Sequence, residues 1–179
     1  MKQNSLYGPI AATLLLIASV GVQVSHAKDQ LPAPTGKQVL EVTGMIDATT
    51  DGTSAYFDID QLMALGPKQI TTATPWTSGT VNFVGIPVKA LLDAVKASGE
   101  TLSVTALNDY TASMPIDVLT DANAILAYEM AGQRLKIRDM GPLWVIFPFD
   151  HVATYRTDAF LAYPFRYVNL SKVPHTINT

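Results

Sequence analysis

Short blocks of apolar and polar residues alternate along this 179-residue chain, and most of them have the period of strands. Runs rich in β-branched and apolar residues, bounded by glycine, proline or asparagine, are typical of strands. The near-continuous apolar run 142–149 predicts a strand buried on both faces. A hairpin is predicted around Ala131-Gly132, between 124–130 and 132–137. Further strands are expected at 37–46, 68–74, 80–85, 101–108, 111–115 and 165–173.

Apolar residues at helical spacing predict few and short helices. The clearest helix starts at Pro87, has apolar residues at i, i+3, i+4 and i+7 from Val88, and is expected to end near Gly99. A shorter helix is expected after Asp58, a suitable N-cap, and before Gly66. A further helical turn follows Pro115. The mixture predicts an α+β fold with a mixed sheet.

The N-terminus has the pattern of a secretory signal peptide. Lys2 precedes an apolar run, Ile10–Val24, and Ser25 and Ala27 are the small residues expected before a cleavage site. A membrane anchor is the alternative, but the run is shorter than the roughly 20 residues that span a bilayer. We therefore expect residues 1–27 to be removed, residues 28–37 to form a flexible tether, and residues 38–179 to fold as one domain in the periplasm.

Composition and charge narrow the classes of function. The whole chain has a net charge of −3 and no basic cluster, which argues against a nucleic-acid partner. It has no cysteine, so a thiolate nucleophile or metal ligand is excluded. Beyond residue 27 the histidines are His151 and His175, without the spacing of a zinc site. We find no Gly-x-Ser-x-Gly elbow and no glycine-rich phosphate loop, so we assign no catalytic residue.

The remaining candidates are polar and aromatic residues near the ends of predicted strands. An indole or phenol offers a flat face to a planar ring, and amide, carboxylate and guanidinium groups can bond to the edge of such a ring. These types together predict a site for a heteroaromatic ligand. The candidate ligand-binding residues are Trp76, Thr77, Asn108, Asp109, Tyr110, Arg138, Asp139, Gly141 and Trp144.

Some of these candidates have structural alternatives. Trp144 lies within an apolar strand, which favours a core position over ligand contact. Arg138 and Asp139 could form an internal ion pair instead of a ligand contact. Trp76 follows a proline in a predicted turn, where a buried structural role is less expected, so it is the residue we assign to the ligand first.

Three stretches, in this order and spacing, resemble the oxidoreductase molybdopterin-binding domain, whose fold is of the sulfite-oxidase type. They are FVGIPVKALLDAV from Phe83, LNDYTASMPIDVL from Leu107, and AILAYEMAGQRLKIRDMGPLWVIFPFD from Ala124. The resemblance covers roughly residues 38 to 150. In the enzymes of this family a cysteine upstream of the Gly-x-Pro helix ligates molybdenum, whereas the comparable stretch here reads ATPWTSG, Ala73–Gly79.

Small exported proteins that lack this cysteine resemble a subgroup regarded as pterin-binding regulators. That resemblance implies a pterin ligand such as a tetrahydropterin, and a partner in the periplasmic domain of a membrane diguanylate cyclase or phosphodiesterase. It also makes a molybdenum centre unexpected. Our leading hypothesis is a monomeric periplasmic pterin binder. The alternatives are a molybdenum-cofactor oxidoreductase with an unusual site and a protein-interaction module with a vestigial pocket.

Overall fold

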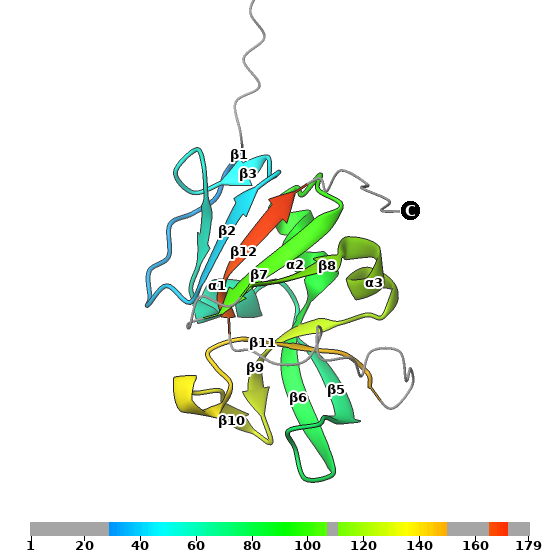
Figure 1. The fold of residues 1–179 in the computed structure, drawn as a ribbon. Coiled ribbons are helices and arrows are strands. Elements are labelled where there is room, and N and C mark those ends of the chain that lie inside the picture. The colour runs from blue at the N-terminus through cyan, green and yellow to red at the C-terminus, as the bar shows by residue number, and fades with distance from the viewer. Residues whose placement is uncertain (1–28, 107–110, 150–164, 172–179) are drawn as a thin grey trace, which may run out of the picture.

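In the computed structural model, residues 29–106, 111–149 and 165–171 are described. They form two five-stranded sheets, a two-stranded pair and a few short helices (Figure 1). The predicted α+β class with a mixed sheet is confirmed, because β12 (Phe165–Ser171) runs parallel to β2 (Leu40–Gly44). The other neighbouring strands in both five-stranded sheets are antiparallel. Within the described ranges, no helix is long and apolar enough to cross a membrane.

The first sheet has the order β10-β9-β6-β5, and β11 pairs with β9 beside β10. The predicted hairpin is confirmed: Ala131 and Gly132 have φ of 51° and 76°, as both central residues of a type I′ turn require. The strand bounds are Lys68–Ala73 for β5, Thr80–Pro87 for β6, Ile125–Met130 for β9, Gln133–Arg134 for β10 and Trp144–Ile146 for β11.

The second sheet has the order β4-β2-β12-β7-β8. Its central strand, β12, lies parallel to β2 and antiparallel to β7, so the end of the described chain closes this sheet between two earlier strands. The bounds are Leu40–Gly44 for β2, Ala55–Phe57 for β4, Thr101–Ala106 for β7, Thr111–Pro115 for β8 and Phe165–Ser171 for β12. The predicted strands are thus confirmed: β8 has the predicted bounds, and the other strands begin or end at somewhat different residues.

The helices begin where the sequence indicates. Asp58 caps α1 (Ile59–Met63) through a capping box with Gln61, and α2 (Val88–Ala94) and α3 (Ile116–Asp121) each follow a proline. The predicted end of α2 near Gly99 is wrong. Lys96 adopts a left-handed conformation (φ 50°), and the N–H of Ala97 donates to the carbonyl of Leu92, so the helix ends in a Schellman turn.

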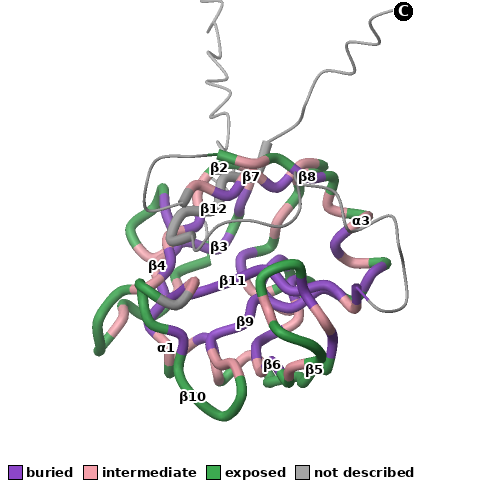
Figure 2. The backbone as a smooth tube through the Cα atoms, turned by 60° about the horizontal axis from the view of Figure 1, so that its bottom comes forward, coloured by how far each residue is buried: buried purple, intermediate pink, exposed green. Residues whose placement is uncertain are grey.

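The core has two parts separated by β9 and β11. Successive residues of β11 point to opposite sides: Val145 packs in the larger cluster, and Trp144 and Ile146 pack in a smaller one around Phe83. This alternation confirms the prediction that the apolar run 142–149 is buried on both faces, as the buried segments of β9 and β11 in Figure 2 also show.

The expectation of a flexible tether at residues 28–37 is corrected for the described residues 29–37. β1 (Asp29–Gln30) pairs in parallel with β3 (Ala48–Thr49), and Asp29 forms an ion pair with Lys96. The N–H groups of Thr35 and Gly36 both donate to the Asp58 carboxylate, at 3.0 and 2.8 Å. Polar, proline-containing sequence therefore docks here by backbone hydrogen bonds, which its composition does not reveal.

Asp58 joins this N-terminal segment to α1. Its Oδ1 accepts from the N–H of Gln61 at 2.8 Å, while its Oδ2 accepts from the segment. These N–H groups, Gln61 first and then Gly36, lower the pKa of the buried Asp58 carboxyl. Because the pKa is lowered on folding, the ionised group stabilises the fold near neutral pH, and this contribution is lost as the pH falls through the folded-state pKa.

A substitution at Gly85 tests the packing of β6 against β9. A Cβ on Gly85 would lie 2.2 Å from the carbonyl oxygen of Leu126 and 2.5 Å from Cα of Ala127, both backbone atoms that cannot move independently of the sheet. We expect Gly85→Ala to lower the free energy of unfolding by at least about 2 kcal/mol, measured by chemical denaturation. Gly36→Ala is the matched control, because its Cβ meets the Asp58 side chain at 3.3 Å. Equal stability of the two variants would contradict the packing.

Candidate functional site

The turn that carries Trp76 is closed by hydroxyl groups. The N–H and the Oγ1 hydroxyl of Thr74 both donate to Oγ1 of Thr77, at 3.0 and 3.1 Å, and the N–H of Thr77 donates to the carbonyl of Thr74 at 3.2 Å. Oγ1 of Thr77 lies 3.1 Å from the carbonyl of Gly79, and the N–H of Trp76 lies 3.3 Å from Oγ1 of Thr74. Thr74 is buried, so this network fixes the backbone on both sides of Trp76.

Trp76 lies on the surface above a buried aromatic pair. The residue is 43% exposed, whereas Trp144 is 3% exposed and Phe83 is fully buried. The Trp76 and Trp144 rings meet edge to face, with centroids 6.0 Å apart and an interplanar angle of 70°. Phe83 meets Trp144 in the same way at 5.6 Å and 89°. The buried rings thus support one side of an indole that leaves apolar surface open to a ligand.

The loop between β10 and β11 lies on the same cluster. Its two ends, Leu135 and Met140, pack with Trp144, and its middle is the short 3-10 helix η1 (Ile137–Asp139). Arg138 is exposed, and Gly141 is buried where a Cβ would lie 2.5 Å from the carbonyl of Leu135. Gly141 therefore has a packing role: it lets the two ends of the loop meet.

The structure brings part of the predicted site together. Trp76 and Trp144 are in contact, Thr77 holds the turn that presents Trp76, and Arg138, Asp139 and Gly141 belong to the loop that packs on Trp144. The expected core position of Trp144 is confirmed, so its part in the site is to support Trp76. Asn108, Asp109 and Tyr110 lie outside the described residues, between strands β7 and β8 of the second sheet.

Two supporting residues escaped the sequence analysis. Thr74 closes the turn with Thr77, and the ring of Phe83 packs edge to face against Trp144. The spacing Thr-Pro-Trp-Thr is the signal for the first, because threonines three apart around a turn can exchange hydroxyl and backbone hydrogen bonds. No comparable signal marks Phe83, which reads as an ordinary core residue of its strand.

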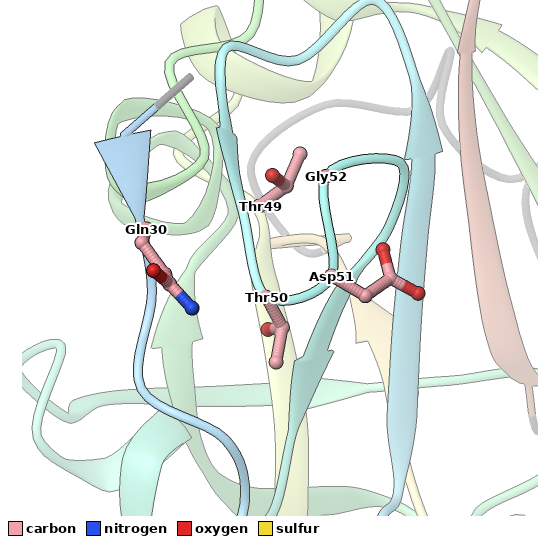
Figure 3. A pocket seen from close by; sticks show the side chains of 5 residues that line it. All are labelled: Gln30, Thr49, Thr50, Asp51 and Gly52. Atoms are coloured by element: carbon pink, nitrogen blue, oxygen red, sulfur yellow. The ribbon is translucent and has the colours of Figure 1, made fainter. Parts of the chain in front are cut away.

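A surface hollow of about 450 Å³ lies elsewhere, between β1 and the turn that follows β3 (Figure 3). It is lined by Gln30, Thr49, Thr50, Asp51 and Gly52, and none of these is a predicted site residue. Asp51 accepts hydrogen bonds from the N–H groups of Ser54 and Thr53 and from the hydroxyls of Thr53 and Tyr56, which hold its pKa well below the usual range. Since its carboxylate is occupied in shaping this turn, we assign no ligand to the hollow.

The residues at the Trp76 turn do not fit a molybdenum centre. The chain contains no cysteine, whereas the family resemblance described above implies a cysteine thiolate as the protein ligand of molybdenum. The hydroxyls of Thr74 and Thr77 are neutral and are bonded to each other. Among the described residues, no cluster of three His, Asp or Glu side chains could hold a metal ion.

Comparison with known families identifies the domain. Residues 39–156 match the family model described as the oxidoreductase molybdopterin binding domain, and the chain therefore belongs to this family. Among solved structures it is similar to the sulfane dehydrogenase SoxCD from Paracoccus pantotrophus, with 15% identity and a TM-score of 0.59. That match covers 85% of this chain and only 40% of the SoxCD chain. Because the identity is low, the match shows the fold alone. The comparison with curated proteins found no match.

Tryptophan fluorescence tests the arrangement of the two indoles, because Trp76 and Trp144 are the only tryptophans of the chain. We expect Trp76→Phe to shift the emission maximum to shorter wavelength, since only the buried Trp144 then emits. Trp144→Phe should leave a maximum at longer wavelength that an added quencher reduces strongly. Equal quenching of the two variants would contradict the assignment of one exposed and one buried ring.

Proposed function

We propose that this protein binds a reduced pterin, such as a tetrahydropterin, and acts as a periplasmic regulatory protein without catalysing a reaction. The observation that carries the proposal is the exposed indole of Trp76, held by a hydroxyl-closed turn over a buried aromatic pair. A pterin is a flat heteroaromatic bicycle, so one face can lie on an indole while its edge bonds to polar groups. Membership in a molybdopterin-binding family supports this ligand class.

The same turn argues against oxo-transfer. In the resemblance described above, this stretch corresponds to the region in which the enzymes hold molybdenum through a cysteine. Here a threonine pair closes the turn, and the whole chain has no thiol. A binding site of this kind recognises the organic ring and leaves the metal without its protein ligand. The second candidate, a molybdenum-cofactor oxidoreductase or a subunit of one, is favoured by family membership alone.

A binder that does not react changes nothing unless a second molecule distinguishes its loaded and empty states. We propose that residues 1–27 direct export to the periplasm and that the monomeric domain reports pterin status to the periplasmic domain of a membrane diguanylate cyclase or phosphodiesterase. The signal-peptide pattern and the resemblance to pterin-binding regulators support this assignment. A protein-interaction module with a vestigial pocket is the third candidate, and it predicts a partner without a ligand.

Calorimetric titration with a tetrahydropterin under anaerobic conditions tests ligand binding. Trp76→Ala removes the stacking face and should weaken binding by about 1 to 2 kcal/mol, or roughly five- to thirtyfold in Kd. Trp76→Phe is the matched control, because it retains a flat ring and should lose less affinity. The thermal midpoint of the empty Trp76→Ala protein should stay close to that of the parent, since the residue is 43% exposed.

Two results would count against this proposal. Equal affinity of parent and Trp76→Ala would remove Trp76 from the binding site. No binding by the parent of oxidised or reduced pterins would leave the interaction module as the better account.

A further inference from the structure

The loop from Leu135 to Gly141 is closed at its neck. The N–H of Gly141 donates to the carbonyl of Lys136 at 2.8 Å, and the backbone of Gly141 approaches Leu135 so closely that a Cβ would meet its carbonyl at 2.5 Å. Leu135 is itself buried, and its N–H donates to the carbonyl of Tyr128 at 2.9 Å. Met140 completes the loop in a left-handed conformation. The segment is therefore a preformed protrusion anchored on β9.

The tip of this loop presents an aliphatic side chain to solvent. Ile137 is 60% exposed, more than Trp76, and these two are the exposed large hydrophobic residues within residues 29–105 and 111–149. Lys136 and Arg138 flank it, and both are exposed. Lys136 and Arg138 are the basic residues of this tip, and Asp139 follows them, in a protein whose net charge is −3. Arg134 belongs to β10, where its guanidinium lies 4.6 Å from the centroid of the Tyr128 ring. An apolar anchor between cations is thus displayed on an otherwise acidic molecule.

The base of the loop connects the tip to the ligand site. Leu135 and Met140 pack in the same cluster as Trp144, and Trp144 contacts the ring of Trp76. A ligand that changes the packing of the two indoles therefore acts on residues within three positions of Ile137. A surface placed in this way can present different geometry in the loaded and empty states.

We propose that the tip Lys136–Arg138 is the docking contact for a protein partner whose surface has an apolar pocket rimmed by carboxylates. The inference rests on the proposed function for the identity of that partner, the periplasmic domain of a membrane cyclic di-GMP enzyme. A rigid loop loses little conformational freedom on binding, which suits a central apolar anchor. An anionic membrane is the less suitable occupant, because membrane-binding clusters carry about four to eight basic residues and this segment carries fewer.

The experiment measures the affinity of the purified full-length mature protein for the periplasmic domain of a diguanylate cyclase from the same organism, with and without tetrahydropterin. Ile137→Ser should raise Kd for the complex at least about tenfold, as loss of a central anchor does. Lys136→Glu should raise it as well, and more at low salt. Ile137→Leu should retain binding. Lys68→Glu, at an exposed lysine of β5, is the charge control and should leave Kd unchanged.

The pterin affinity of each variant, measured without the partner, separates docking from ligand binding. Ile137→Ser should bind tetrahydropterin as the parent does, while Trp76→Ala should not. A parent complex that Ile137→Ser forms equally well would overturn the docking surface and leave the proposed function standing. No complex with the parent in either ligand state would overturn both the docking surface and the proposed relay.

Two further results would replace the partner that we propose. Binding of the parent to vesicles of phosphatidylethanolamine and phosphatidylglycerol, lost in Ile137→Ser, would make the tip a membrane contact. Self-association of the parent in sedimentation, lost in the same variant, would make it an interface between copies of this chain. Either result without a complex with the cyclase domain overturns the inference.

Discussion

The packing of β9 between β6 and β11 is the constraint on which the candidate site depends. In the register of this sheet, Ala127 lies opposite Gly85 on one side and Trp144 on the other. The two small residues, Gly85 and Ala127, are thus aligned across the strands with the large Trp144. A shift in register beside Gly85 brings the backbones of β6 and β9 into close approach. This arrangement holds Trp144 beside Phe83, and Trp144 in turn supports both Trp76 and the loop ends at Leu135 and Met140.

Local signals were sufficient for most of the fold. Asp58 forms the capping box that its position predicts, and the hairpin at Ala131-Gly132 has the positive φ values of a two-residue turn. The burial of 142–149 on both sides of the strand follows from a sequence that is apolar on both faces. These features depend on neighbours in sequence, which is why residue type and spacing revealed them. The end of α2 was missed because the left-handed residue is Lys96 instead of the glycine that usually occupies this position.

Long-range pairing accounts for what the sequence did not reveal. The docking of residues 29–36 depends on Asp58 and on the backbone of β3, and neither contact leaves a pattern in a polar, proline-containing stretch. In the candidate site, too, local sequence indicated one feature and a long-range contact determined another. The exposure of Trp76 agrees with its position after a proline, but its contact with Trp144 joins residues 68 positions apart and required the fold. The exposure of Ile137 also depends on the closed neck of its loop, which only the meeting of Leu135 and Gly141 explains.

The chain belongs to a molybdopterin-binding family but contains no thiol. The two facts are compatible if the protein still recognises the pterin ring and no longer holds the metal. Analysis of the protein purified from its native host, by mass spectrometry of released small molecules together with metal quantification, tests this claim most directly. The account predicts a pterin released from the protein and molybdenum far below one atom per chain. Near-stoichiometric molybdenum, with turnover of an oxo-transfer substrate, would contradict it.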